Sequence, residues 1–281
     1  MIDGATRAGI LRYVRGRRCR EGGYCFYRLE EPNGSDTFHA VATLALLGAL
    51  GEDVETVSFL KERQLPDGSY ESVMQAYYCI LSLDIFGQRP RLDPSAYLLS
   101  QFETYDPDLV PVEVPSVFRK LFLVAAAWRR LGLAPPPDKR GEILSFLLRF
   151  RKDDGGFGHP SSTLLETCQA LAVFRLLGAD FPGPGAEAFL RACEDPVYGF
   201  LNIPGVRPAF LEHVAAGVGA AGLLGLRPRY TRGLINFVSA CRTTTGGFSR
   251  TTNTGIATLE NTHEAVGILA ALDGRGQQMT A

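Results

Sequence analysis

The sequence predicts an all-α protein of six helical hairpins that close into a ring, and three observations support this prediction. Apolar helical segments end in glycine at a nearly regular interval, and a repeating interval is typical of repeat proteins. Each repeat pairs an amphipathic segment with a more apolar one. The alternation of apolar and polar residues that is typical of strands is missing from the sequence. The closing glycines are 39, 45, 46 and 47 residues apart, at Gly48, Gly87, Gly132, Gly178 and Gly225.

The clearest hairpin runs from Phe146 to Gly178. An apolar helical stretch leads into a glycine pair, Gly155-Gly156, which is followed by Phe157. Glycine is typical of a turn between two elements, because it adopts backbone conformations that other residues avoid. A polar loop and a second apolar helix complete the hairpin. Related turns place glycine beside an aromatic residue at positions 22–24, 68–70, 198–200 and 246–248.

We therefore place six repeats in a single domain that covers residues 1–281. In the first repeat, Ser35 or Asp36 is expected to cap the second helix. The third repeat is the least regular, because the segment TYDPDLVPVEVP stands where the others have a glycine turn. The repeats cover residues 10–48, 57–87, 95–132, 142–178, 186–225 and 231–272.

The two helices of each hairpin differ in polarity. The second helix is apolar nearly all round, so we expect it to be buried on both sides. The first helix is amphipathic and is expected to face solvent. Six inner and six outer helices form either an open solenoid or a ring, and the apolar inner helices favour the ring. Several glycines in the fifth inner helix indicate either close approach of a neighbour or local softness.

Composition argues against several classes of function. Lysine and arginine number 29 and aspartate and glutamate 30, so the charge gives no basis for nucleic-acid binding. No apolar run reaches the roughly 20 residues of a transmembrane helix. The first residues do not show a secretory signal pattern. Six scattered cysteines are typical of reduced thiols, so we expect a cytoplasmic protein.

Several repeat motifs resemble a known superfamily. DDGGFG, GGFS, QLPDGSY and DTFHAVATLALLG resemble repeats of protein prenyltransferase β subunits, and FLKERQLPDGSY also resembles repeats of squalene and hopene cyclases. The resemblance implies an α/α toroid whose central apolar cavity binds an isoprenoid diphosphate. It also implies a helical partner subunit.

The resemblance further implies a zinc ion that activates a thiol, held by an Asp-x-Cys pair and a histidine. His263 lies where the family histidine is expected. The preceding repeat has His213 and Ala215 at the Asp-x-Cys positions, whereas Glu166-x-Cys168 lies one repeat earlier. Cys168, His213 and His263 are therefore the candidate metal ligands. In the simpler interpretation, Cys168 is buried and both histidines cap or hydrogen-bond at helix starts.

Three glutamates lie at or near the starts of inner helices: Glu166, Glu212 and Glu260. They are candidate catalytic acids at the mouth of the ring. Carboxylates are also stabilised by the helix dipole at such positions, so structural capping is the alternative.

Cations and aromatic rings complete the candidate substrate site. Arg119, Lys120 and Arg207 are candidates for binding the diphosphate, and the alternative is that each is a solvated charge. Ring side chains would pack against the prenyl chain, although each could equally belong to the core. Tyr78 and Phe122 are the main candidates, from the set Tyr77, Tyr78, Phe118, Phe122, Trp128 and Phe174.

The sequence thus favours a transferase that moves a prenyl group from its diphosphate to a thiol or another small acceptor. One alternative is a terpenoid cyclase, although the Asp-x-Asp-Asp acid of those enzymes is absent and Asp106 and Asp108 are the nearest match. The other alternative is a toroid without catalytic activity that binds a lipid or a protein.

Overall fold

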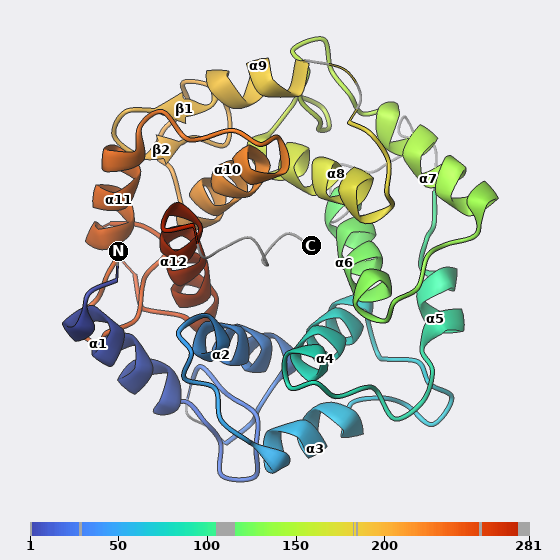
Figure 1. Cartoon of the computed structure of the whole chain (residues 1–281), viewed down its shortest axis with the longest axis vertical. Coiled ribbons are helices and arrows are strands. Elements are labelled where there is room, and N and C mark those ends of the chain that lie inside the picture. Colours follow the sequence, from blue (N-terminus) through green and yellow to red (C-terminus); the bar gives the residue numbers. More distant parts are fainter. Residues whose placement is uncertain are drawn as a thin grey trace. The chain divides into compact units, whose positions relative to one another are not determined.

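The computed structural model describes residues 2–27, 30–104, 116–181, 183, 185–252 and 255–274. Asp106 and Asp108 lie outside the described residues. Within the described part, the chain forms twelve helices in six successive pairs (Figure 1), as the repeats predict. The helices are α1 Gly4–Arg15, α2 Gly34–Leu46, α3 Val54–Glu62, α4 Val73–Ile85, α5 Ser95–Ser100, α6 Val117–Arg130, α7 Pro137–Leu148, α8 Leu164–Leu176, α9 Gly185–Ala192, α10 Leu211–Leu223, α11 Thr231–Ala240 and α12 Leu259–Leu272.

The expectation that the chain has no strand needs a small correction in the fifth repeat. Glu194–Asp195 (β1) and Gly199–Phe200 (β2) pair as two antiparallel strands of two residues each. The glycine–aromatic turns of the first, fourth and sixth repeats contain only isolated bridges, for example between Arg151 and Phe157. Such short pairings give too little alternation to be detected in a sequence.

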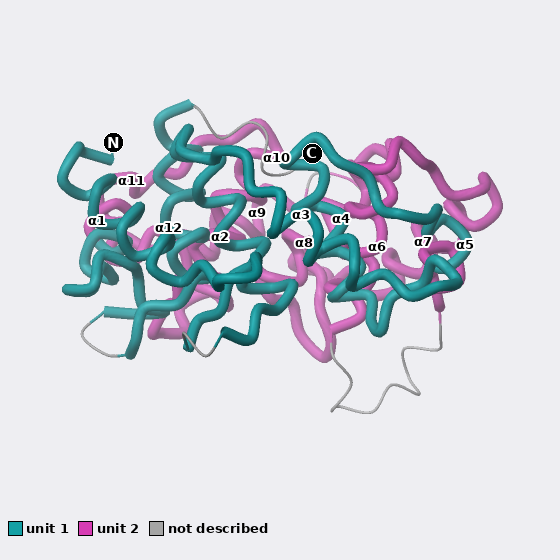
Figure 2. Tube along the Cα trace, turned by 90° about the horizontal axis from the view of Figure 1, so that it is seen from below, with its two compact units in different colours: residues 1–97, 237–276 teal, residues 98–236, 277–281 magenta. Residues whose placement is uncertain are grey.

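The chain divides into two compact units (Figure 2). The first contains residues 1–97 and 237–276, and the second contains residues 98–236 and 277–281. Boundaries between the units therefore fall within α5 and within α11. None of the described helices is both long and apolar enough to span a membrane.

Within each unit the second helices of the repeats pack side by side. In the first unit α2 lies between α12 and α4 (Figure 1), and in the second unit α8 lies between α6 and α10. These helices are buried over most of their length, as their sequences predict. A glycine without a side chain permits close packing in α10. A Cβ atom added at Gly217 would lie 2.2 Å from the ring of Phe200. Of the two explanations for the glycines of this helix, close approach of a neighbour and local softness, the contact at Gly217 supports the first.

The first unit also joins the beginning of the chain to its last repeat. Tyr13 of α1 donates a hydrogen bond of 2.7 Å from its hydroxyl to the carbonyl of Ala257. The turn before α12 lies against α1, because a Cβ at Gly246 would meet the carbonyl oxygen of Gly9 at 2.4 Å. The first and last repeats therefore pack together as neighbours.

Buried threonines connect the turns to the second helices in three repeats. The backbone N–H of Phe157 donates to Thr167 Oγ1 at 2.9 Å in the fourth repeat. Thr37 and Thr262 accept in the same way from the turns of the first and sixth repeats. A buried N–H group needs a hydrogen-bond acceptor. These hydrogen bonds therefore fix the position of each turn along its second helix.

Candidate functional site

Five ring side chains form a cluster on the second helices of the first unit, which we call the aromatic–histidine cluster. Phe38 and His39 lie on α2, Tyr77 and Tyr78 on α4, and His263 on α12. The ring centroids of Phe38 and His263 are 5.5 Å apart, and those of His39 and Tyr78 are 5.6 Å apart. These separations lie within the range of favourable ring contacts.

The two histidines of the cluster contact each other directly. Their Nδ1 atoms are 3.2 Å apart, which is the distance of a hydrogen bond in which one ring donates and the other accepts. On the opposite side of the first ring, His39 Nε2 lies 4.0 Å from a carboxylate oxygen of Glu260. A carboxylate and two imidazoles therefore follow one another in a row.

Burial controls the charge of His263. His39 is only 7% exposed, whereas His263 is half-buried. Burial lowers the pKa of His263 to about 4, because desolvation disfavours the charged imidazolium. His263 is therefore neutral near pH 7.

The residues of the aromatic–histidine cluster lie at a similar distance from the starts of their helices. Each is the fifth or sixth residue of its helix, so all lie within about two turns of a helix start. The side chains of Asn33, Ser72 and Thr258 cap α2, α4 and α12 and fix these starts. The cap of α2 is therefore Asn33, and the expectation of Ser35 or Asp36 was wrong, because the helix begins earlier, at Gly34.

Glu166 lies in a separate polar group in the second unit. Thr163 Oγ1 donates to one carboxylate oxygen at 2.9 Å, and Ser116 Oγ donates to the other at 3.3 Å. Thr163 also caps α8 by accepting from the backbone N–H of Glu166. Burial raises the pKa of Glu166 above its usual value, and the hydrogen bonds oppose this change.

Cys168 and His213 also lie in the second unit, on α8 and α10. Burial raises the pKa of the Cys168 thiol to about 12, and this thiol lies against the backbone of Ala220. His213 Nδ1 accepts a hydrogen bond from the backbone N–H of Phe210 at 3.3 Å and so helps to cap α10. A helix rises about 1.5 Å per residue, so Ala220 is about 10 Å beyond His213 along α10.

These positions bear on the predicted zinc site. The described residues contain no group of three or more His, Cys, Asp or Glu side chains arranged to hold a metal ion. In the second unit the contacts of Cys168 and His213 lie at different levels of α10, so these two donors do not fit a shared ion. Zinc binding stays a prediction to be measured.

The predicted cations have different surroundings. Lys120 forms an ion pair with Glu103 at 2.6 Å. Arg207 donates two hydrogen bonds to one carboxylate oxygen of Asp195, at 2.7 and 3.2 Å. Arg119 is exposed on α6. A diphosphate would have to compete with carboxylates for two of these three side chains.

The other predicted residues divide between surface and core. Phe122 is half-buried on α6, and Glu212 is half-buried in the first turn of α10. The remaining large rings of the predicted set are core residues, namely Phe118, Trp128 and Phe174.

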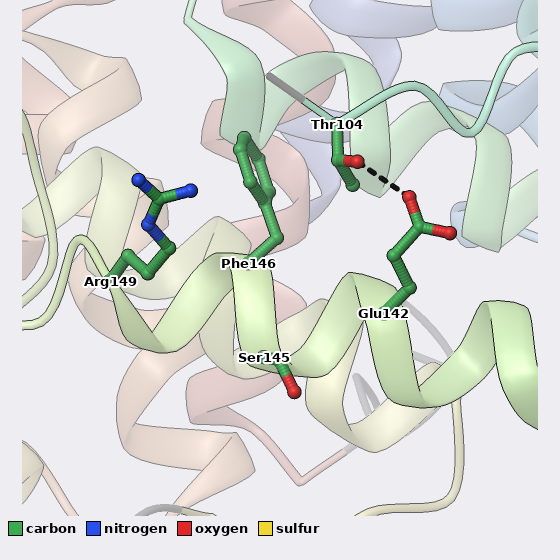
Figure 3. A pocket seen from close by; sticks show the side chains of 5 residues that line it. All are labelled: Thr104, Glu142, Ser145, Phe146 and Arg149. Atoms are coloured by element: carbon green, nitrogen blue, oxygen red, sulfur yellow. Dashed lines mark hydrogen bonds between the residues drawn. The ribbon is translucent and has the colours of Figure 1, made fainter. Parts of the chain in front are cut away.

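Two surface clefts lie away from the cluster, one in each unit. The cleft in the first unit has a volume of about 970 Å³ and lies between the first turn and α3. The cleft in the second unit has about 280 Å³ and lies on α7, where Thr104 donates to Glu142 beside Phe146 (Figure 3). Neither cleft is lined by a residue of the aromatic–histidine cluster.

Phe38 and His39 are the cluster residues that the sequence did not single out. A signal was present: His39 and Tyr78 both lie nine residues before the glycine that closes their repeat. Two ring side chains at the same position of neighbouring inner helices point to a shared surface. The partner His263 is 224 residues away, so sequence spacing gave no reason to pair them.

Comparisons with known proteins agree with this architecture. The sequence matches the family described as the prenyltransferase alpha-alpha toroid domain over residues 1–71, 96–202 and 206–280. A search of curated proteins finds no match. Among solved structures, Candida albicans protein geranylgeranyltransferase-I complexed with GGPP has a TM-score of 0.70 at 12% identity, covering 95% of this chain and 91% of that chain.

Two glycosidase variants, one of them in complex with glucose, each have a TM-score of 0.53 at 12% identity, covering 98% of this chain and 99% of theirs. At this identity, likeness to solved structures is evidence for the fold alone. The family match covers most of the chain, and with its paired helices it shows an all-α fold of the α/α toroid class. The chain therefore belongs to the prenyltransferase α-α toroid domain family.

Proposed function

We propose that this protein binds an isoprenoid diphosphate and transfers its prenyl group to a thiol or another small acceptor. The observation that carries the proposal is the aromatic–histidine cluster, which places ring side chains and two histidines together on the second helices of the first unit. Membership of the prenyltransferase toroid family supports the same reaction class.

The composition of the cluster suits a ligand with an apolar chain and a polar end. Phe38 and Tyr78 are 8% and 5% exposed, so they form a fixed backing. Tyr77 is half-buried and packs against both of them, with ring centroids 5.7 and 5.3 Å away. An isoprenoid chain that covers Tyr77 would gain binding free energy from the apolar surface that it removes from water. The ligand named in the similar Candida albicans structure, GGPP, belongs to this class.

The binding step is tested by calorimetric titration with geranylgeranyl and farnesyl diphosphate. We expect at least one of them to bind more tightly than inorganic pyrophosphate, because pyrophosphate lacks the apolar chain. Tyr77→Ala should weaken binding about tenfold, since truncating an aromatic ring removes roughly 1–2 kcal/mol of apolar contact. Met74→Ala is the matched control, because Met74 is an exposed side chain on the same helix.

Three outcomes would contradict the proposal. Equal affinity for pyrophosphate and the prenyl diphosphates would show that the apolar chain does not contribute to binding. Equal losses of affinity in Tyr77→Ala and Met74→Ala would show that the ligand binds elsewhere. Conversion of a prenyl diphosphate or squalene to cyclic products, without transfer, would favour the cyclase alternative.

The helical partner subunit and the central cavity that the sequence resemblance implies stay predictions. Partner binding is tested by whether the protein elutes alone or with a second chain when it is purified from its native cells.

A further inference from the structure

We propose that the surface formed by residues 194–208 and 227–233 binds peripherally to membranes that contain anionic lipids. We call it the arginine–aliphatic surface. It lies in the second unit, where β1 and β2 stand between α9 and α11 (Figure 1). The proposal does not depend on prenyl transfer, because it concerns residues outside the aromatic–histidine cluster.

Large apolar side chains are exposed on this surface. Val197, Ile203 and Val206 are 54%, 37% and 55% exposed, and Tyr230 is 40% exposed. They make up four of the eleven large apolar side chains that are exposed in the described part of the chain, although the two segments are short. Single exposed apolar residues are normal, whereas several gathered on one surface are typical of a site that binds a partner or a membrane.

Two contacts show that the segments form one surface. Arg207 donates two hydrogen bonds to a carboxylate oxygen of Asp195, which joins the loop before α10 to the turn between β1 and β2. A Cβ atom added at Gly233 would lie 2.0 Å from the carbonyl oxygen of Pro196, so the first turn of α11 packs directly on that same turn. The exposed apolar side chains of both segments therefore lie around one turn.

The charges exposed on the arginine–aliphatic surface are all positive. The carboxylates of the two segments, Glu194 and Asp195, have side chains that are only 1% and 6% exposed, and both form ion pairs with arginine. They are therefore hidden from a ligand at the surface. The exposed charged residues are Arg207, Arg227, Arg229 and Arg232.

The sequence around this surface is equally one-sided in charge. From residue 196 to residue 259 it contains six arginines, no lysine and one acidic residue, Glu212. The whole chain has 29 basic and 30 acidic residues, so positive charge is concentrated in this part of the sequence. A local excess of positive charge is attracted by the negative surface potential of an anionic bilayer even when the net charge of the protein is near zero.

A bilayer surface satisfies both features of this surface at once. Its anionic headgroups complement the arginines, and its acyl chains accept the aliphatic side chains. Binding to a nucleic acid relies mainly on phosphate contacts and would leave Val197, Ile203 and Val206 without apolar partners. Because peripheral binding strengthens with both buried apolar area and electrostatic attraction, removal of either contribution should weaken it.

The proposal is tested by co-sedimentation of the full chain with lipid vesicles, without any prenyl diphosphate. Vesicles of phosphatidylcholine alone are compared with vesicles that also contain about 30% phosphatidylserine. We expect the protein to bind the anionic vesicles about tenfold or more tightly than the neutral ones. Raising NaCl from about 0.1 M to about 0.5 M should weaken this binding, because salt screens the attraction between exposed charges.

The electrostatic contribution is measured with Arg227→Gln and Arg232→Gln, which leave the ion pairs of Glu194 and Asp195 in place. An arginine at an anionic bilayer contributes about fivefold to binding, so each variant should bind about fivefold more weakly and the double variant about 25-fold. Arg91→Gln, at an exposed arginine of the first unit, is the matched control and should bind like the wild type.

The apolar contribution is measured at Val206. Val206→Ser should weaken binding to anionic vesicles about fivefold, because less apolar surface leaves water. Leu148→Ser, at an exposed leucine on α7 of the same unit, is the control and should have no effect. Val206→Trp should strengthen binding, since tryptophan favours the membrane interface. Trp128 is the only tryptophan in the natural sequence and is buried, so a blue shift of emission on adding vesicles would report insertion at position 206.

Four outcomes would overturn the proposal. The first is a protein that does not sediment with anionic vesicles, and because these contain no isoprenoid, prenyl transfer is then judged separately by titration with prenyl diphosphates. The second is an equal loss of binding in the surface variants and their controls. The third is full binding in Val206→Ser with loss only in the arginine variants, which describes a site for any polyanion, including an acidic protein. The fourth is a dimer that Val206→Ser converts to a monomer, since the surface would then join two copies of the chain.

Discussion

His263 shows how the surroundings of one side chain make stability depend on pH. Burial lowers its pKa to about 4, whereas an imidazole in an unfolded chain titrates near 6.5. Above pH 6.5 the ring is neutral in both states and contributes no pH dependence. As the pH falls below 6.5, the unfolded chain binds a proton that the folded protein does not bind until the pH nears 4. The folded state therefore loses stability across this interval.

We expect the free energy of unfolding to decrease by about 3 kcal/mol between pH 6.5 and pH 4 through His263, from 1.36 kcal/mol per pKa unit. His263→Asn should remove most of this decrease, because asparagine does not titrate. Urea unfolding at pH 7, 5.5 and 4.5 measures the difference. An identical slope in His263→Asn would show that another group controls the loss of stability in acid.

At the scale of elements, each turn is held to its second helix by a recurrent set of contacts. Thr167 accepts from the backbone of Phe157 and is 1% exposed, and Thr37 and Thr262 are fully buried in the same role. Glycine lets the next repeat approach the same turn: a Cβ at Gly155 would lie 2.3 Å from the backbone of Gly185. The threonine hydrogen bond thus fixes the turn to its second helix, and the close approach at glycine fixes the turn to the following repeat.

Thr167→Val should lower the free energy of unfolding by about 1–3 kcal/mol, because valine keeps the shape of threonine but leaves the buried N–H of Phe157 without an acceptor. Thr167→Ser retains the hydroxyl and loses one methyl group, so it should cost about 1 kcal/mol. Chemical denaturation of both variants separates the two contributions. If valine leaves the free energy of unfolding unchanged, the hydrogen bond to Phe157 contributes little to stability.

At the scale of the whole molecule, the beginning of the chain is part of the same unit as its last repeat. Gly246 packs against Gly9, and Tyr13 reaches the loop before α12. This pairing repeats the contact by which earlier turns meet the next first helix, as between Gly22 and Glu55. The last turn thus uses α1 in place of a following repeat.

Gly246→Ala should destabilise the protein by about 3 kcal/mol or more, since its φ of +95° disfavours alanine and the new Cβ would lie 2.4 Å from the carbonyl oxygen of Gly9. Gly48→Ala is the control: its φ is +59°, but no atom lies within 4 Å of the added Cβ. Strain alone should cost about 1–2 kcal/mol there. Denaturation midpoints of the two variants give the comparison, and equal losses would mean that contact between first and last repeats contributes little.

Much of the fold could be predicted because its signals are local. Helix periodicity, closing glycines and glycine–aromatic turns lie within one repeat, and they located all six helix pairs. The short strands β1 and β2 escaped because two residues carry no detectable alternation. In the candidate site, Tyr78 was predicted from its place on an apolar helix; the structure places it in the cluster, and its role in substrate binding stays a prediction. Lys120 and Arg207 were chosen for their charge, but their carboxylate partners Glu103 and Asp195 could be known only from coordinates.

The sequence by itself determined the repeats, the polarity of their helices and the family, because each depends on residues close together in the chain. Only the tertiary structure brought His39 to His263 and α1 to the last turn. Contacts across more than 200 residues depend on how the repeats stack, and no periodicity within a repeat encodes which side chains then meet.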